Sequence, residues 1–173
     1  MVVLKNLLPN SIKEEAHDAL VLSPGAEPIR PPLSGIEDER IFTIRTVPDI
    51  DAVKHYIDTK RPKRAVIIGG GFIGLEMAEN LHHRGIFVTI VEALPQVLNV
   101  LDFEMAAMVH KQLKAKGVEL YINTAVKQFS QQGSQLAVLL ADGTTLHADL
   151  AILSIGVKPD TRFIQEVGIK CCS

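Results

Sequence analysis

Ala65-Val66-Ile67-Ile68-Gly69-Gly70-Gly71-Phe72-Ile73-Gly74 is the stretch that decides the fold. Its first four residues are apolar and mostly β-branched, which predicts a short buried strand. Its last six residues have the spacing G-x-G-x-x-G, and apolar side chains recur at helical spacing from Gly71 to about His82. The stretch therefore predicts a strand, a tight glycine turn and a helix, in that order.

The three spaced glycines have different predicted roles in this turn. Gly69 allows the chain to change direction sharply, Gly71 lets the backbone approach a pyrophosphate, and Gly74 permits close packing of the helix on the strand. The first turn of the helix adds free N–H groups and a partial positive charge, both of which favour phosphate. The motif thus predicts a dinucleotide-binding unit of the Rossmann type.

An acidic residue follows where this motif requires one. Glu92 ends the predicted strand Phe87–Val91, about 20 residues after the turn. A carboxylate there can accept hydrogen bonds from the ribose hydroxyls of NAD, whereas it repels the 2′-phosphate of NADP. No arginine follows it in residues 93–96 to neutralise that phosphate. The sequence therefore predicts NAD(H) as the ligand; the alternative is a purely structural glycine turn with a surface glutamate.

The remaining pattern predicts an α/β fold with a Rossmann-like parallel sheet and a β-meander crossover. One helix starts at Pro48-Asp49 with Asp49 as its cap, and another runs from Asp102 to Gly117. The other predicted strands are short and end at turn signals. They cover residues 19–22, 41–44, 119–122, 126–129, 136–140, 145–147 and 150–154.

Bulk composition excludes several classes of protein. The chain has 173 residues, of which 47% are hydrophobic, and its net charge is −2. That content is too high for a disordered chain, and the charge gives no basic field for nucleic acid or an anionic membrane. No apolar run reaches the roughly 18 residues of a membrane span, and no signal-peptide pattern opens the chain. We therefore expect no nucleic-acid or membrane partner, and a cytoplasmic location.

The cysteines and the paired histidines and methionines could in principle be functional, but their pattern favours a purely structural role or none. Cys171 and Cys172 are adjacent, which disfavours a disulfide between them and does not match a CxxC redox or zinc motif. His82 and His83 diverge by about 100° around a helix axis, so we expect no metal site. The Met105–Met108 pair is expected in the core.

Three longer stretches resemble the NADH-binding segment of the pyridine nucleotide–disulfide oxidoreductases. They are AVIIGGGFIGLEMAE (65–79), VTIVEALPQVL (88–98) and LAILSIGVKPDTRF (150–163). The branch they resemble holds coenzyme A-disulfide reductases, NADH oxidases and CoA-persulfide reductases. DALVLSPGAEPIRPPLSGIE (18–37) is similar to the end of that family's first flavin-domain segment. The resemblance extends to about Lys170.

The resemblance implies a flavoprotein in which an NAD domain is inserted into a discontinuous FAD domain, and hydride passes from NADH to the flavin and on to a cysteine. It also implies a set of contacts between NADH and this chain. Residues 69–74 would hold the pyrophosphate, Glu92 the adenosine ribose, and Ile155 and Gly156 the nicotinamide end. Glu76 would lie near the nicotinamide, unless it is a solvated helix acid, and Leu101 over the cofactor; Gly156 could equally be a strand-ending glycine. The full expected set is Ile68, Gly69, Gly70, Gly71, Phe72, Ile73, Gly74, Glu76, Glu92, Leu101, Ile155 and Gly156.

The sequence also departs from the family pattern. The first, FAD-binding G-x-G-x-x-G, the redox cysteine motif and the later Gly-Asp motif are all absent. We therefore expect a fragment without catalytic residues. Residues 1–47 would be a β-rich remnant of the FAD domain, 48–160 the NAD(H)-binding domain, and 161–173 a tail leading back to the FAD domain.

Three hypotheses of function follow from this assignment. In the first, the chain is the NAD(H)-binding domain of an FAD-dependent NADH oxidoreductase acting on a disulfide, a persulfide or oxygen. FAD would then belong to the parent enzyme, expected to be a homodimer, and would not be retained by this chain. In the second, the chain is a stand-alone NAD(H)-binding module without turnover. The third, an NAD-sensing interaction domain, is disfavoured because no partner motif is present.

Overall fold

The computed structural model describes residues 1–166, and the chain divides into two compact units. The larger unit comprises Ala26–Lys158, and the smaller one comprises Met1–Gly25 together with the described residues from Pro159 onward. Cys171 and Cys172 lie outside the described residues.

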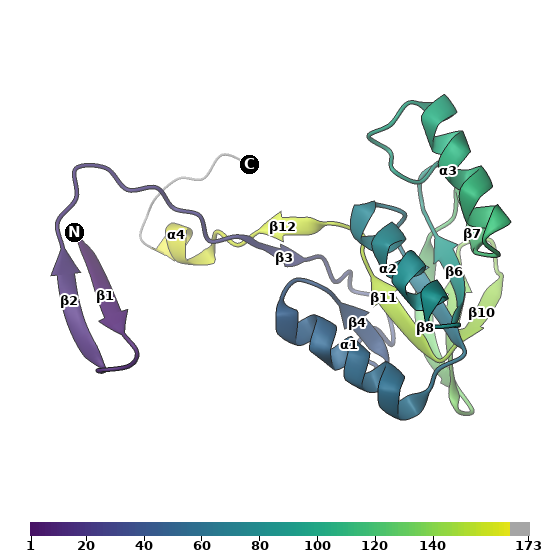
Figure 1. Cartoon of the computed structure of the whole chain (residues 1–173), viewed down its shortest axis with the longest axis horizontal. Helices are drawn as coiled ribbons and strands as arrows, with labels where there is room; N and C mark the ends of the chain where they lie inside the picture. Colours follow the sequence, from purple (N-terminus) through teal and green to yellow (C-terminus); the bar gives the residue numbers. More distant parts are fainter. Residues whose placement is uncertain (167–173) are drawn as a thin grey trace. The chain divides into compact units, whose positions relative to one another are not determined.

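A five-stranded sheet forms the centre of the larger unit (Figure 1). Its strands are paired in parallel throughout, with fully buried isoleucines such as Ile67 and Ile90 in register on neighbouring strands. Such continuous apolar strands are typical of a parallel sheet covered on both faces. In spatial order the strands are β4 (Ile41–Thr43), β11 (Leu150–Leu153), β5 (Arg64–Ile68), β6 (Phe87–Val91) and β7 (Glu119–Tyr121). The Rossmann-like fold class is thereby confirmed.

Helices cover one face of this sheet. They are α1 (Val47–Lys60), α2 (Phe72–His83) and α3 (Phe103–Ala115). α2 packs on β5 and β6, where its Ala78 and Leu81 meet the alternate residues Ala65 and Ile67 of β5. None of the helices in the described part of the chain has the length and apolar character required to cross a bilayer.

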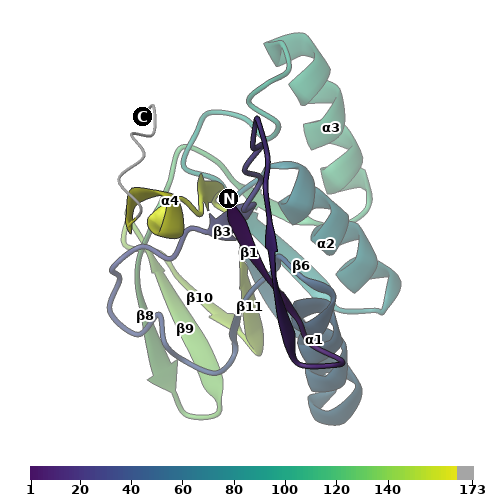
Figure 2. The same cartoon turned by 90° about the vertical axis from the view of Figure 1, so that its left-hand side faces the viewer.

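A β-meander covers the other face, so the larger unit has three layers (Figure 2). It consists of β8 (Val126–Gln132), β9 (Gln135–Leu140) and β10 (Thr145–Ala148), paired antiparallel as the hairpin signals predict. Phe129 and Leu136 pack there against Val66 and Ile68 of β5. Period-two alternation along β5 thus sends neighbouring side chains into two separate cores.

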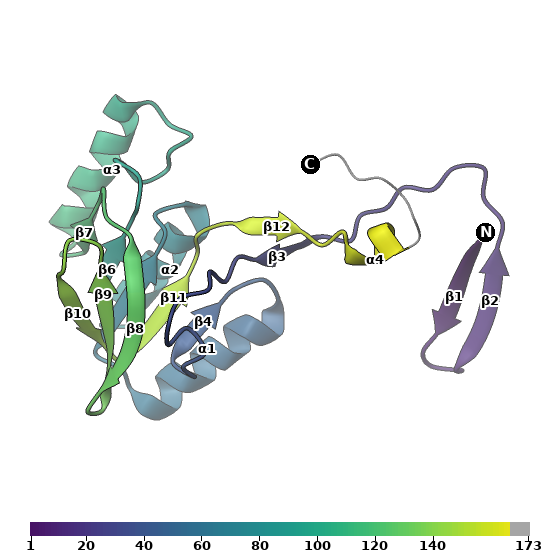
Figure 3. The ribbon, with the colours of Figure 1, turned by 180° about the vertical axis from the view of Figure 1, so that it is seen from behind.

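Two further strands pair near the end of β11. They are β3 (Ala26–Pro28) and β12 (Val157–Pro159), and the backbone N–H of Ile29 donates to the carbonyl of Gly156 at 3.0 Å. The pairing holds the segment that follows β11 beside residues from the start of the larger unit (Figure 3).

The smaller unit contains elements that the sequence pattern did not indicate. β1 (Val2–Asn6) and β2 (Ser11–Glu15) form an antiparallel hairpin, and α4 (Arg162–Glu166) is a short helix. The buried strand predicted at 19–22 was wrong, because these residues form no strand and the Val21 side chain is 87% exposed. A β-strand forms only where a neighbouring strand pairs with its backbone groups, and none of the described strands pairs with this run.

The start of α1 also differs from the prediction. Thr46, with extended backbone angles, is the N-cap, and Asp49 lies three residues inside the helix. The Asp49 carboxylate accepts the backbone N–H groups of Thr46 at 2.7 Å and Arg45 at 2.9 Å. Pro48 is favoured in a first helical turn, where its missing N–H costs nothing, so the helix begins before the proline.

The expectation that Met105 and Met108 are core residues was wrong. Their side chains are 54% and 67% exposed. Ala106 is the buried residue of α3, and Leu113 packs at the edge of the core beside α2. Because Ala106 lies on the buried face of α3, Met105 and Met108 lie about 100° and 200° away from it around the helix axis, on the exposed side.

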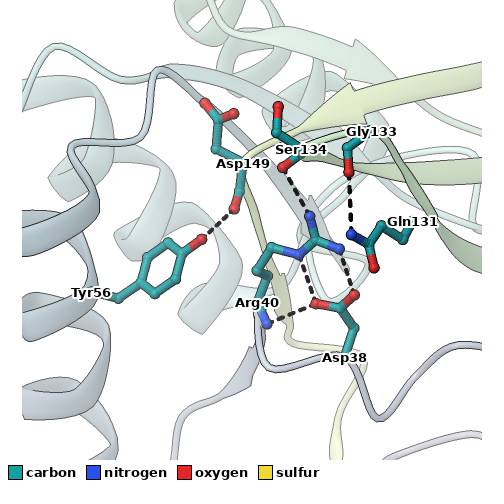
Figure 4. Close-up of polar contacts among 7 residues, drawn as sticks. All are labelled: Asp38, Arg40, Tyr56, Gln131, Gly133, Ser134 and Asp149. Carbon is teal, nitrogen blue, oxygen red and sulfur yellow. Dashed lines mark hydrogen bonds and ion pairs between the residues drawn. The ribbon is translucent and has the colours of Figure 1, made fainter.

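An ion pair between Asp38 and Arg40, in the segment before β4, orients the Arg40 guanidinium, which bonds to the meander at Ser134 (Figure 4). The Arg40 guanidinium donates to both carboxylate oxygens of Asp38, at 2.7 and 2.6 Å, and to the carbonyl of Ser134 at 3.0 Å. The two side chains are only 19% and 11% exposed. The hydrogen bonds from Arg40 hold the pKa of Asp38 below its usual value.

We predict that Asp38→Asn destabilises the fold by about 1–3 kcal/mol at neutral pH, because Arg40 loses its charged partner while remaining largely buried. The folded-state pKa of Asp38 is lowered, so its contribution is present above the unfolded value of about 3.9 and is lost as pH falls below it. Urea unfolding should therefore show the gap between wild type and variant shrinking below about pH 4.

The matched control is Asp58→Asn, which breaks the exposed pair of Asp58 with Arg84 at 3.0 Å. Exposed pairs contribute about 0–1 kcal/mol, so this change should be small at every pH. An Asp38→Asn variant as stable as the control would refute the structural role of the Asp38–Arg40 pair.

Candidate functional site

The glycine turn lies between β5 and α2, at the carboxyl ends of the parallel strands. Gly69 has a φ of +106°, and a Cβ there would lie 2.4 Å from the carbonyl oxygen of Ser154. Its N–H donates to the carbonyl of Val91 at 2.8 Å. The backbone of the turn is thus pressed between the ends of β11 and β6, where only glycine fits.

Gly74 and Gly71 have opposite surroundings. A Cβ on Gly74 would lie 2.1 Å from the Gly69 carbonyl oxygen and 2.8 Å from the Ser154 hydroxyl, so this glycine allows α2 to pack on the turn. A Cβ on Gly71 would meet nothing within 4 Å, and the φ of −78° suits any residue. Neither backbone strain nor packing within the chain calls for glycine at Gly71. Its missing side chain leaves open space at the N-terminus of α2, where a phosphate would be stabilised.

Glu92 joins the end of β6 to the glycine turn. One carboxylate oxygen accepts the Gly70 N–H at 2.6 Å, and the other accepts the Leu94 N–H at 2.8 Å. Each carboxylate oxygen has two lone pairs, so each can still accept one further hydrogen bond. The acid is therefore both anchored in position and able to receive two hydroxyl groups.

A cavity of about 730 Å³ opens over these groups. This size lies in the range of small-molecule sites. Nine of the expected site residues line it: Ile68, Gly69, Gly70, Gly71, Phe72, Ile73, Glu92, Ile155 and Gly156. Its other walls are mainly apolar and come from the meander and the β3–β4 segment, including Phe129, Val126, Leu33 and Ile44. The structure thus brings most of the expected residues together around one space.

Three expected residues do not line the cavity. Gly74 is buried beneath the turn, and Glu76 is exposed on α2. Leu101 is half-buried, and its carbonyl accepts the side-chain amide of Gln96 at 2.7 Å.

Sequence reasoning missed several residues of this site. Leu94, Leu98, Asn99 and Val100, from the loop after β6, line the cavity although their loop has no periodicity to reveal it. The hydroxyl of Thr124 is buried and has no hydrogen-bond partner among the described residues. Ser154, whose hydroxyl donates to the carbonyls of Ile68 and Gly69 at 3.0 Å, could have been noticed as a polar residue at the end of an apolar strand.

The described residues contain no cluster of three histidine, cysteine or acidic side chains that could hold a metal ion. The rings of His82 and His83 lie 6.4 Å apart at the end of α2.

The parallel sheet, the glycine turn at its carboxyl edge and the acid on the next strand define an α/β domain of the Rossmann-like class. Comparison with known proteins identifies the family. The sequence pattern of the pyridine nucleotide-disulphide oxidoreductase family matches residues 2–173, so the chain belongs to that family.

Relatives within the family are similar in sequence and in structure. The NADH oxidase of Methanocaldococcus jannaschii is 36% identical over 158 residues, covering 91% of this chain and 35% of the relative. The crystal structure of reduced CoADR-RHD from Bacillus anthracis is 45% identical, with a TM-score of 0.87 over 98% of this chain and 30% of that one. The NAD-dependent persulfide reductase of A. fulgidus is 33% identical, with a TM-score of 0.85 over 94% of this chain and 30% of that one. The chain therefore spans about a third of the length of the relatives it matches.

We predict that Gly71→Val and Gly74→Val separate a ligand-facing glycine from a packing glycine. Gly71→Val should abolish dinucleotide binding while changing stability by about 1 kcal/mol or less, because its side chain enters open space. Gly74→Val should destabilise the fold by at least about 1–3 kcal/mol, because its side chain overlaps the Gly69 carbonyl.

Melting temperature and NADH titration of both variants make the comparison, each variant serving as the control for the other. Near-native NADH affinity in Gly71→Val would show that the open space beside Gly71 is not where the dinucleotide lies.

Proposed function

We propose that this chain binds NAD(H) in the cavity above the glycine turn, as the NAD(H)-binding domain of an FAD-dependent NADH oxidoreductase acting on a disulfide, a persulfide or oxygen. The observation that carries the proposal is the Glu92 carboxylate, held 2.6 Å from the Gly70 amide and adjacent to the open space at Gly71. This arrangement places a phosphate site and a ribose acceptor side by side, as binding of one dinucleotide requires.

The residues of the cavity divide between the two ends of the dinucleotide. The pyrophosphate lies at residues 69–74, where the first N–H groups of α2 have no acceptor within the helix. The adenosine ribose lies at Glu92, which leaves Ile155 and Gly156 at the end of β11 for the nicotinamide ribose and ring. Glu76 and Leu101 are assigned to the nicotinamide and to the cofactor surface through the family resemblance. NADH, when bound, supplies a hydride.

The oxidoreductase part of the proposal follows from membership of the family. Relatives that match nearly all of this chain include an NADH oxidase and an NAD-dependent persulfide reductase. By analogy, residues 48–160 form the NAD(H)-binding domain, and residues 1–47 and 161–173 belong to the FAD domain. The whole protein is proposed to be a homodimer.

In this proposal the chain by itself binds NADH and does not turn it over, because the flavin and a redox cysteine carry the subsequent chemistry. The absorbance spectrum of the purified chain tests this point, since bound oxidised flavin makes a protein yellow. A colourless chain that binds NADH without consuming it is expected. Sustained NADH oxidation by the purified chain would contradict the assignment.

We predict that NADH binds about tenfold more tightly than NADPH. The 2′-phosphate would lie beside the Glu92 carboxylate, which costs about 1 kcal/mol or more at surface dielectric. No arginine or lysine is among the cavity-lining residues that the structure describes, so nothing offsets this repulsion. Calorimetric titration with both cofactors measures the ratio.

Glu92→Ala should bring the affinities for NADH and NADPH closer together, mainly by weakening NADH binding. The substitution removes the acceptor for the ribose hydroxyls together with the hydrogen bonds to Gly70 and Leu94. Glu79→Ala, at an exposed position on α2 outside the cavity, is the matched control and should leave the ratio unchanged. Equal affinities for the two cofactors in the wild type would overturn the role of Glu92.

A further inference from the structure

We propose that His110 is a positioning residue for dinucleotide binding: it holds the loop Ala93–Leu101, here called the strap, against the glycine turn only while its imidazole is neutral. The proposal rests on the proposed NAD(H) site and adds a residue to it that does not line the cavity.

The strap connects Glu92 to α3 and forms one wall of the cavity. Leu94, Leu98, Asn99 and Val100 line the cavity from this loop. The strap is also joined directly to the phosphate site, because the Leu98 N–H donates to the Gly70 carbonyl at 2.9 Å. The place of the strap therefore determines both the cavity wall and the setting of the glycine turn.

Val97 is the point at which the strap is fastened. Its side chain is fully buried and lies against Gly70, so closely that a Cβ on Gly70 would be 2.7 Å from it. Its backbone N–H donates to Nε2 of His110, in the middle of α3, at 3.1 Å. The His110 imidazole is therefore the hydrogen-bond acceptor of a part-buried backbone amide in the strap.

Hydrogen bonds within the strap link the neighbours of Val97 to the rest of the loop. The Leu101 N–H donates to the Leu98 carbonyl at 2.8 Å, and the Gln96 side-chain amide donates to the Leu101 carbonyl at 2.7 Å. Outside the strap, its backbone is bonded to Gly70 and Glu92 at the ligand site, to Asn123, whose N–H donates to the Leu94 carbonyl at 3.0 Å, and to His110 on α3. His110 is the bond that holds the Val97–Leu98 part of the strap, which contacts Gly70, to α3, so its loss loosens the strap at the point nearest the glycine turn.

The bond to Val97 requires an unprotonated Nε2, because an imidazolium ion has N–H donors at both ring positions and no acceptor. Burial first, and then the charge of Lys114 one turn further along α3, lower the pKa of His110. The strap carries no titratable side chain. On β7, against which α3 packs, Glu119 accepts the hydroxyl of Thr89 and Tyr121 is the other titratable group. The imidazole is therefore neutral at neutral pH.

The sign of the pH effect follows from this lowered pKa. Folding with the strap in place favours neutral His110, so its contribution is full above the unfolded value of about 6.5 and is lost as pH falls through the folded value. Protonation would set the Nε2–H against the Val97 N–H and release the strap. Dinucleotide affinity should therefore fall on mild acidification.

NADH titrations of the full chain at about pH 8 and about pH 5.5 test the proposal. Two variants separate hydrogen bonding from packing: His110→Gln supplies an acceptor that does not titrate, and His110→Leu supplies none. Wild type should lose affinity between the two pH values, by up to about tenfold, which is the loss expected for one part-buried hydrogen bond. His110→Gln should bind near wild-type levels at the higher pH and lose much less on acidification. His110→Leu should bind NADH more weakly than wild type at the higher pH, by a similar factor, and should lose little more on acidification.

The matched control is His83→Gln, which removes an exposed histidine at the end of α2 and should keep the wild-type pH profile. Hydrogen exchange at the Val97 amide reports the strap without the ligand. Its protection factor, which is the exchange rate corrected for the intrinsic rate at each pH, should fall in acid for wild type but not for His110→Gln.

The outcomes distinguish the two proposals. If wild type binds NADH but His110→Gln keeps the same acid loss, the His110 proposal is wrong. If His110→Leu does not fold, the pH profile of His110→Gln and the hydrogen exchange of the Val97 amide determine whether the His110 proposal is correct. If wild type does not bind NADH at any pH, the proposed function fails, and the role of His110 in binding fails with it.

Discussion

The structure depends on one close approach of backbone to backbone, where Gly69 turns away from β5 beneath the end of β11. The carbonyl of Ser154 occupies the place that a side chain of Gly69 would take, and the carbonyl of Gly69 occupies the place that a side chain of Gly74 would take. Because these contacts exclude any Cβ, the start of α2 is drawn down onto the carboxyl ends of the strands. The helix N-terminus then opens directly on the cavity.

The parallel sheet gives this turn its neighbours. β6 lies beside β5 in register, so its last residue places Glu92 next to the glycine turn rather than elsewhere on the surface. β11 lies on the other side of β5 and delivers Ser154, Ile155 and Gly156 to the same edge. A site assembled in this way needs no precise long side chains, since most of its polar groups belong to the backbone.

The site also depends on residues that touch no ligand. Val97 packs on Gly70, and His110 accepts the Val97 amide from a helix on the far side of the strap. The Asp38–Arg40 pair has a comparable structural role at another place, where it joins the segment before β4 to the turn between β8 and β9. Both features use a side chain to satisfy or fasten irregular backbone, which regular hydrogen bonding within helices and strands does not reach.

Local pattern alone was enough to predict the three helices of the larger unit, the strands of the central sheet and the meander, because their apolar periodicity records which face is buried. It also indicated the glycine turn and its acid, whose spacing is a property of one βαβ unit. What the tertiary structure decided is everything that depends on contacts between distant segments. Ala19–Leu22 is as apolar as a strand but has no partner strand in the described part of the chain, and Met105 and Met108 face outward because Ala106 is the residue that packs. The strap and His110 meet only because the chain folds back on itself, and no spacing in the sequence carries that information.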